Sequence, residues 1–290
     1  MTRKPRPRSF DRIVVALDRS RSSRSALEAA AMLAEALQSE LHGLFVEDAD
    51  LLALAQLPFS REIQAQGGGI RNLDPGDLER AFEIEMAEAR SAVETAAAQR
   101  GLRWKFQSVR GKVHTEVNAA ATEVDILCIG RHGASTRQAA PLGGTVRMAL
   151  AGRAPVLIAS DPSRCLGGPV AVMFDASAAA LDCARFGAEI AQRSGQDLIL
   201  LVRASSDEEE QLLRKALDGH LPDGVRSSYV RVDPADPSTP PQTVRAGQFG
   251  LIISTTESGI PAPAWLEFMA LAAGCPLLLV PNGQKRDTPG

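Results

Sequence analysis

Three glycines lie in a short stretch that directly follows an apolar run of the sequence. They are Gly130, Gly133 and Gly143, so their spacing is G-x2-G-x9-G. Glycine lets main-chain N–H groups approach a ligand closely, and a row of such groups attracts anions. The segment from Val146 to Ala151 has a helical pattern, and a helix N-terminus adds unpaired N–H groups and a positive dipole end. The residue types and spacing indicate a phosphate-binding loop, although glycines at such a join also serve simply to make a turn.

Cationic side chains accompany these glycines. Arginine forms charge-assisted hydrogen bonds with phosphate oxygens, and three arginines lie in or just after the loop, namely Arg131, Arg137 and Arg147. His132 lies in the same loop, either as a phosphate contact or, the interpretation that we favour, as a partly exposed loop residue. Together these side chains would help to neutralise a polyphosphate.

The sequence lacks the motifs of several other nucleotide-binding, metal-binding and catalytic sites. The chain has no Walker A loop, no G-x-G-x-x-G after the first strand of either half and no G-x-S-x-G elbow. Its histidines are scattered, without metal-ligand spacing. Its cysteines form no C-x-x-C pair, so we expect buried thiols in a reducing, cytoplasmic compartment. We find no constellation for nucleophilic or acid–base catalysis and do not expect an enzyme.

Length and composition set broad limits. The 290 residues allow one large domain or two of ordinary size. A hydrophobic fraction of 44% with 23% charged residues is typical of a soluble globular protein. The net charge of -3 and the aromatic fraction of 4% argue against a nucleic-acid partner. No apolar run reaches the roughly 18 residues that a membrane-spanning helix needs, so we expect no membrane partner.

An internal repeat organises the elements that must position the loop. An apolar run ending in aspartate, a turn of small residues, a helix and a second strand occur twice in the same order. A shift of 157 positions superposes Asp18 on Asp175 and Leu44 on Leu201. The predicted helices cover residues 26–37 and 181–193, and the second strands cover 40–46 and 197–202. The small residues at 176–180 are predicted to form the turn of the second half.

Later runs of Val, Ile and Leu complete the pattern, at residues 125–130, 154–159, 250–255 and 275–280. Such continuous runs are typical of strands buried on both faces of a parallel sheet. We therefore predict an α/β fold of two tandem doubly wound parallel-sheet domains, at residues 10–160 and 168–282. A long helix from Pro75 to Arg100 is expected between an Asp74 cap and a Gly101 stop. The segment 48–73 is expected to be a mobile flap with one or two helical turns at 51–57.

The glycine spacing resembles the ATP-binding signature of the universal stress protein family, and the similarity covers most of both halves. The resemblance implies a Rossmann-like fold of the adenine nucleotide alpha hydrolase type. It also implies that Asp18 lies near the adenosine, that the backbone around Val46 faces the adenine and that the three glycines wrap the phosphates. The implied cofactor is ATP, bound with Mg²⁺.

Two departures from the family pattern bear on this expectation. The residue after the third glycine is usually Ser or Thr, but here it is Gly144, followed by Thr145. Either Thr145 substitutes, or the hydrogen bond is absent at a cost of ~1.5–3 kcal/mol, roughly ten- to hundredfold in affinity. In the second half, Thr255 and Ser258 stand where the first two glycines would be. We predict that this half binds no nucleotide in the same way and that Asp175 caps the turn that follows it.

These observations leave two main hypotheses. The first is an ATP-binding regulator of the stress response that acts through its first domain on an unidentified protein partner, with weak ATP hydrolysis or self-phosphorylation left open. The alternative is a nucleotide-free scaffold of the same fold, and a small-molecule enzyme of related architecture is a third. In members of the family, the last strand of each domain is commonly an exposed edge that pairs two domains, so the resemblance implies that residues 156–159 and 277–280 pair with each other within one chain. This pairing would give a pseudo-symmetric monomer, with further dimerisation left open.

Overall fold

The computed structural model of the chain describes residues 10–18, 20–63, 70–122, 126–130, 154–159, 165–233, 248–255 and 274–281. The first half contributes strands β1 (Arg12–Leu17), β2 (Glu40–Asp48), β5 (Trp104–Gly111), β6 (Ile126–Gly130) and β7 (Val156–Ala159). The second half contributes strands β8 (Val170–Phe174), β9 (Leu198–Arg203), β10 (Ser227–Val232), β11 (Leu251–Thr255) and β12 (Leu277–Val280).

The described helices are α1 (Arg21–Leu37), α2 (Ala49–Ala55), α3 (Pro75–Arg100), α4 (Val113–Thr122), α6 (Ala178–Ser194) and α7 (Asp207–Leu217). Two short strands, β3 (Arg61–Ile63) and β4 (Ile70–Asn72), form a separate antiparallel pair. None of these helices is both long enough and apolar enough to cross a bilayer.

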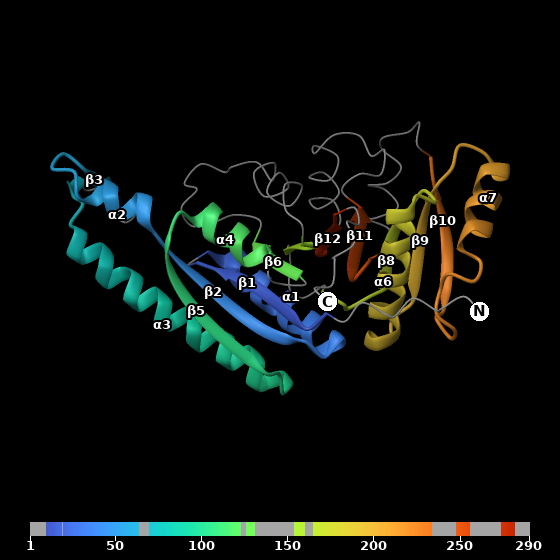
Figure 1. Cartoon of the computed structure of the whole chain (residues 1–290), viewed down its shortest axis with the longest axis horizontal. Coiled ribbons are helices and arrows are strands. Elements are labelled where there is room, and N and C mark those ends of the chain that lie inside the picture. The colour runs from blue at the N-terminus through green and yellow to red at the C-terminus, as the bar shows by residue number, and fades with distance from the viewer. Residues whose placement is uncertain are drawn as a thin grey trace, which may run out of the picture.

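Ten strands form one sheet in the order β10-β9-β8-β11-β12-β7-β6-β1-β2-β5, which runs along the length of the molecule (Figure 1). Each half therefore supplies five strands in the same spatial order, counted inwards from its outer edge. All neighbours in this sheet are parallel except β7 and β12, which pair antiparallel where the halves meet. The predicted α/β class and the predicted pairing of the two final strands are confirmed. The predicted domain boundaries stay a prediction.

Helices cover both faces of the sheet. On one face, the inner sides of α1, α3, α6 and α7 pack with strand residues of both halves into one continuous buried cluster. Leu157 and Leu278, on the two central strands, belong to this cluster, so its apolar packing crosses the junction between the halves. On the other face, Val117 of α4 packs with a second cluster of strand residues. Burial on both faces explains why the strands read as continuous apolar runs.

The first helix of each half begins earlier than predicted. The sequence predicts starts at residues 26 and 181, but α1 begins at Arg21 and α6 at Ala178. A serine side chain caps each helix: Ser20 accepts from the N–H of Ser23, and Ser177 accepts from the N–H of Ala180. A serine at this position satisfies one of the unpaired N–H groups of the first turn. Residues 21–25 and 178–180, which were expected to lie in turns, are therefore already helical.

The long helix α3 matches its predicted bounds. Asp74 caps it by accepting from the N–H of Asp77, and Gly101 ends it in the left-handed conformation, with φ of 63°. The segment 48–73 was expected to be a mobile flap with one or two helical turns, and its described part holds more regular structure than that. It contains α2, capped by Asp48, and the β3–β4 pair. The expected helical turns at 51–57 overlap α2.

Side chains also join the two halves across the helical layer. The rings of Phe10 and Phe186 stack with centroids 4.2 Å apart. Arg193 of α6 donates from Nη1 to the carbonyl oxygen of Leu37, the last residue of α1, over 2.7 Å. A cation at a helix C-terminus interacts favourably with the carbonyls that lack a partner there. The second half thus caps a helix of the first.

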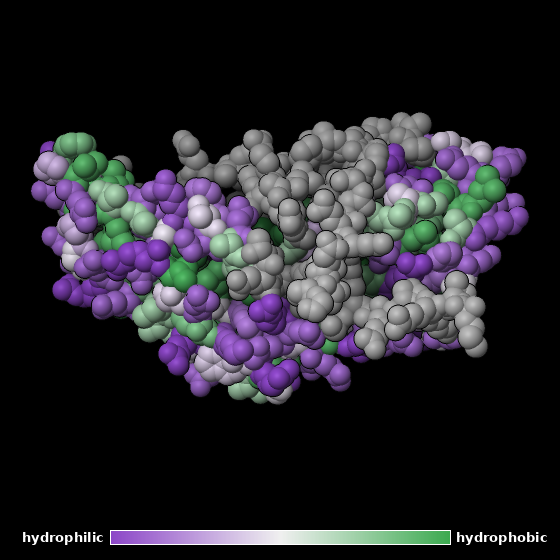
Figure 2. Space-filling model, viewed as in Figure 1, coloured by the Kyte–Doolittle hydropathy of each residue, from purple (hydrophilic) through white to green (hydrophobic). Residues whose placement is uncertain are grey.

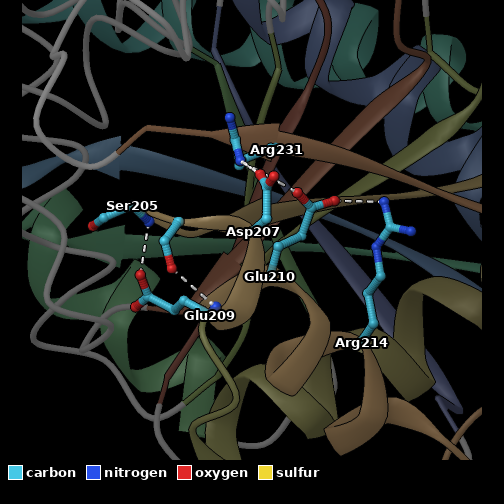
Figure 3. A network of polar contacts seen from close by, with 7 residues as sticks. Ser205, Asp207, Glu209, Glu210, Arg214 and Arg231 are labelled. Carbon is cyan, nitrogen blue, oxygen red and sulfur yellow. Dashed lines mark hydrogen bonds and ion pairs between the residues drawn. The ribbon is translucent and has the colours of Figure 1, made fainter.

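The outer edge of the second half carries a polar network (Figure 3). Arg231 of the edge strand β10 forms ion pairs with Asp207 and Glu210 of α7, and Arg214 pairs with Glu210 at 2.5 Å. At the start of α7, the N–H of Ser205 donates to Oε2 of Glu209 over 2.7 Å. The network ties α7 to β10, and charged side chains on an edge strand also discourage pairing with another chain.

Candidate functional site

The predicted site residues that the structure describes lie at one edge of the sheet, on the neighbouring strands β6, β1 and β2. The pairing of Leu17 with Phe45 puts Asp18, the next residue of the chain, level with Val46 on β2. The pairing of β1 with β6, continued by two residues, puts Gly130 level with Leu17. A strand rises about 3.3 Å per residue, so Asp18, Val46 and Gly130 lie within about one residue of the same level. The fold therefore brings these three predicted residues together.

The turn after β1 is built by the side chain of Asp18 and by serine hydroxyls. Oδ1 of Asp18 accepts from the N–H of Ser20 over 2.8 Å, and the N–H of Asp18 donates to Oγ of Ser23 over 3.0 Å. The hydroxyls of Ser20 and Ser22 lie 3.0 Å apart. Because Ser20 is the N-cap of α1, this arrangement fixes the first turn of α1 next to the end of β1. It places several hydroxyls at the carboxyl edge of the sheet.

Gly130 lies directly against that turn. A Cβ atom at this position would be 2.6 Å from the carbonyl carbon of Ser22, 2.7 Å from its oxygen and 2.9 Å from its Cβ. These are backbone and near-backbone atoms, which have little freedom to move aside. Glycine is therefore required here by the close approach of α1 to β6. This packing is a structural reason for the first glycine of the motif, additional to any ligand contact.

The remaining predicted site residues lie outside the described residues. They are Arg131, His132, Gly133, Gly143, Gly144, Thr145 and Val146. The proposed roles of the loop glycines and of its cationic side chains stay predictions. The edge of the sheet from which the loop departs, at the end of β6, is the part of the site that the structure describes.

Sequence reasoning missed the serine hydroxyls as site residues. Residues 19–23, which follow Asp18, were interpreted only as a serine-rich turn. The signal that was available is the spacing of Ser20, Ser22 and Ser23 after a strand that ends in aspartate. In an α/β sheet, groups at the carboxyl ends of strands next to a helix N-terminus face the place where ligands bind.

The corresponding edge of the second half has the same turn but different surroundings. Oδ1 of Asp175 accepts from the N–H of Ser177 over 3.0 Å, as Asp18 does with Ser20, which confirms the predicted capping role of Asp175. The first turn of α6, however, carries Ala178, Ala179 and Ala180 where α1 has Arg21, Ser22 and Ser23. Ala179 and Ala180 are buried. The second half thus lacks the hydroxyls of Ser22 and Ser23 at this edge.

A buried thiol lies on the strand that precedes the loop. Cys128 lies two residues before Gly130 and is fully buried. Burial raises the pKa of the Cys128 thiol well above its usual value, because a thiolate is poorly stabilised among apolar side chains. The thiol is therefore protonated at neutral pH. Among the described residues, no group of three or more His, Cys, Asp or Glu side chains is arranged to hold a metal ion.

Comparison with known proteins decides the family. The sequence profile of the universal stress protein family matches residues 9–159. The chain belongs to the universal stress protein family. The matched region contains Asp18, Val46 and the whole glycine loop, so the resemblance predicted for the first half is confirmed. No curated protein sequence matches the chain.

Solved structures extend the fold comparison over both halves. A universal stress protein from Archaeoglobus fulgidus DSM 4304 is 16% identical, with a TM-score of 0.69 over 94% of this chain and 98% of that one. A protein of unknown function from Pseudomonas aeruginosa PAO1 is 14% identical, with a TM-score of 0.62 over 94% and 93%. A putative universal stress protein from Pseudomonas aeruginosa UCBPP-PA14 is 14% identical, with a TM-score of 0.59 over 94% of both chains. The fold of this universal stress protein is thus one that recurs across entire chains of similar length.

Proposed function

We propose that this universal stress protein is an ATP-binding regulator whose first half holds the nucleotide, with Mg²⁺, at the carboxyl edge of β6, β1 and β2. The observation that carries the proposal is the convergence of Asp18, Val46 and Gly130 at that edge, next to the serine-rich N-terminus of α1. The loop that departs from Gly130 has the glycine spacing expected for polyphosphate. Adenosine would lie over Asp18 and Val46, and the loop from Gly130 to Thr145 would surround the phosphates.

The second half would act as a nucleotide-free copy of the same domain. Thr255 stands at the end of β11 where Gly130 ends β6, and its side chain is buried. The alanines at the start of α6 support the same proposal, because they offer no hydroxyl to a ribose or phosphate. The match of a universal stress protein structure over 94% of this chain supports the proposed tandem arrangement.

The proposed role is regulation rather than catalysis. Among the described residues of this edge, the carboxylate of Asp18 is engaged by the N–H of Ser20 and so serves the turn. A general base must lie within hydrogen-bond reach of the proton that it removes, whereas the geometry of Asp18 is that of a carboxylate that forms a turn. ATP would instead favour one of two conformations of the chain, which requires different affinities for the two.

The test is calorimetric titration of the whole chain with ATP and Mg²⁺. A bulky side chain at Gly133 would displace the phosphates, so Gly133→Val is expected to weaken binding at least roughly hundredfold. Ser258→Val, at the corresponding position of the second half, is the matched control and is expected to bind as the wild type does. Equal binding by all three proteins would remove the glycine loop from the site.

The nucleotide-free scaffold remains the second candidate because of one residue, Gly144. It stands where the family usually has a hydroxyl for a phosphate. Acid extraction of the freshly purified protein separates the two candidates. Adenine nucleotide in the extract supports the ATP-binding regulator. Its repeated absence, together with no thermal shift on adding ATP and Mg²⁺, supports the scaffold.

A further inference from the structure

The first half carries an arm that the second half lacks. The arm consists of α2, the β3–β4 pair and the first turns of α3, at residues 49–63 and 70–82. It lies beyond the end of β2, at the end of the molecule next to β5 (Figure 1). In the second half, β9 is followed almost at once by α7, with only residues 204–206 between them. The arm is therefore an addition to the plan that the two halves share.

The inner side of the arm is already packed. Leu52 and Ala55 of α2 are 8% and 4% exposed, and Leu52 shares a buried cluster with Phe45 and Phe82. The rings of Phe45 and Phe82 meet edge-on, with centroids 6.5 Å apart. This cluster anchors α2 to α3 and to β2. The arm thus needs no further apolar residues on its outer side in order to fold.

The outer side nevertheless carries three large apolar side chains, which we call the apolar patch. Leu54, Leu57 and Phe59 are 48%, 42% and 74% exposed. Figure 2 shows hydrophobic residues gathered at this end of the molecule. Single exposed apolar residues are ordinary, but a group of them on one ordered turn marks an interaction surface.

Hydrogen bonds hold the apolar patch in a fixed conformation. The N–H of Leu57 donates to the carbonyl oxygen of Leu54 over 3.1 Å, and the N–H of Ser60 donates to that of Leu57 over 3.0 Å. The buried hydroxyl of Ser60 donates to the carbonyl oxygen of Leu54 over 2.5 Å. The carbonyl of Ser60 in turn accepts from the N–H of Leu73, next to the cap of α3. The patch is pre-organised, which lowers the entropy lost on binding.

The surroundings of the apolar patch are predominantly acidic. Asp50 lies one helical turn before Leu54 and is 67% exposed, with its nearest cation, Lys112, 3.9 Å away. Asp74 adjoins Leu73, which is bonded to Ser60, and is itself exposed. Further described acids of the arm and its base are Glu47, Asp48, Asp77 and Glu79, against the cations Arg61, Arg80, Arg110 and Lys112. Arg80 pairs with Asp77, and Arg110 pairs with Glu47 and Glu79. With Asp50 and Asp74, the described acids still outnumber the described cations by six to four. An apolar centre with an excess of negative charge at its rim is complementary to a cationic amphipathic partner.

We propose that the apolar patch is a docking site for a basic amphipathic helix of a partner protein, whose apolar face covers Leu54, Leu57 and Phe59. A helix presents apolar side chains at spacings of three and four residues, which suits a small patch of this kind. The acidic rim disfavours an anionic membrane surface. It also disfavours a second copy of the chain, because two acidic rims would face each other. The proposal does not depend on nucleotide binding.

The test uses a fluorescent synthetic helix of leucine and lysine, with all leucines on one face, and measures anisotropy as the whole chain is added. The double variant Leu54→Ser, Phe59→Ser is expected to weaken binding at least about tenfold, since central aromatic anchors dominate such contacts. Asp50→Lys is expected to weaken it by roughly threefold, mainly at low salt. Leu212→Ser is the matched control: Leu212 is a 67% exposed leucine on the acidic helix α7, and binding should stay as in the wild type.

Four outcomes would overturn the proposal. One is equal binding by the double variant and the Leu212→Ser control, which would show only general charge attraction. Another is equal binding of the same peptide with glutamate in place of every lysine. A third is binding of phosphatidylglycerol vesicles that the double variant abolishes, which would assign the patch to a membrane. The fourth is a concentration-dependent dimer that the double variant abolishes, which would assign the patch to a second copy. Thermal unfolding of the double variant at the wild-type temperature establishes that the arm is folded.

Discussion

Leu157 of β7 and Leu278 of β12 lie directly opposite each other in the antiparallel pair that joins the two halves of the sheet. The pairing is symmetric about these two residues, because Val156 pairs with Leu279 on one side and Ile158 pairs with Leu277 on the other. In the repeat, Leu157 and Leu278 occupy the same position of their halves. The pair therefore lies on the local two-fold axis that relates the halves. At this point, the sheet continues from one half into the other.

The first prediction concerns the coupling of these two leucines. Both are completely buried, so Leu157→Ala and Leu278→Ala should each lower the free energy of unfolding by about 2–5 kcal/mol. Because they are cross-strand neighbours, the double variant should lose less than the sum by roughly 0.5 kcal/mol or more. Urea denaturation measures all three values. Leu212→Ala, at a 67% exposed position, should change the free energy by no more than about 0.5 kcal/mol, and strict additivity of the two core variants would contradict the pairing.

The second prediction concerns the helix cap between the halves. Arg193→Met keeps most of the apolar stem but removes both the donor to the carbonyl of Leu37 and a local ion pair with Glu189. The loss should be about 1 kcal/mol of unfolding free energy, the usual net value of such a hydrogen bond. Arg185→Met is the matched control on the same helix, because it removes a local ion pair with Asp182, as Arg193→Met removes the one with Glu189. If the two variants were equally stable, the contact between the halves would contribute nothing measurable.

The third prediction separates packing from ligand binding at the first glycine. A Cβ at Gly130 would clash with the backbone of Ser22, and a Cβ at Gly43 would lie 2.7 Å from Cγ2 of Val93. Gly130→Ala and Gly43→Ala should each destabilise the fold by about 1–3 kcal/mol. Only Gly130→Ala should also weaken ATP binding by the folded protein, because Gly43 lies inside β2, away from its carboxyl end. Thermal unfolding measures the loss of stability, and calorimetric titration measures the loss of ATP affinity. Equal loss of affinity in both variants would mean that Gly130→Ala weakens ATP binding only by destabilising the fold.

Much of the fold followed from apolar runs in the sequence. Strands that are buried on both faces give continuous apolar runs in the sequence. The predicted ends of β6, β7 and β12 therefore lie within two residues of the ends in the structure. The pairing of β7 with β12 was predicted from the family resemblance, and the need to cover two apolar edge strands supports it. The starts of α1 and α6 were missed because the deciding feature is a single serine side chain, Ser20 or Ser177, and alanines or serines beyond it are compatible with turn or helix.

The candidate site was only partly accessible from the sequence. The spacing of the glycines identified the loop, but the contact of Gly130 with Ser22 depends on how closely α1 approaches β6, and this distance has no sequence signature. The arm was interpreted as a flap because β3 and β4 are three residues each, too short for a periodic pattern to be recognised. Its capped helix α2 was predicted in outline because Leu51 to Leu57 is apolar at helical spacing.

The fourth prediction concerns thiol reactivity. All four cysteines carry thiols rather than disulfides, and all four are buried. Burial raises the pKa of Cys165 to about 12 and that of Cys128 well above its usual value. Since the thiolate is the reactive form, iodoacetamide should label neither residue in the native protein at mildly alkaline pH and should label both in guanidinium chloride. Mass spectrometry of labelled peptides gives the extent at each site. Rapid native labelling of Cys128 would show that the end of β6 opens to solvent.

The last prediction concerns the pH dependence of stability through Glu40. Oε2 of Glu40 lies 2.6 Å from Nε2 of His42 and 3.2 Å from Nζ of Lys105. The hydrogen bond with His42 is the main cause that lowers the pKa of Glu40 below its usual value, against the opposing effect of burial. A lowered pKa in the folded state means that the ionised carboxylate stabilises the fold above the unfolded pKa, and that this contribution disappears as the pH falls through the folded pKa.

Glu40→Gln should therefore reduce the free energy of unfolding at neutral pH, by at most about 1 kcal/mol because the pair is partly exposed. The difference from the wild type should vanish in acid, where Glu40 is protonated in both states. His42→Asn removes the main partner, so Glu40→Gln should have a smaller effect in that background. Urea denaturation from neutral to acidic pH measures each difference. A difference that stays constant over this range would show that the loss comes from packing and not from the charge of Glu40.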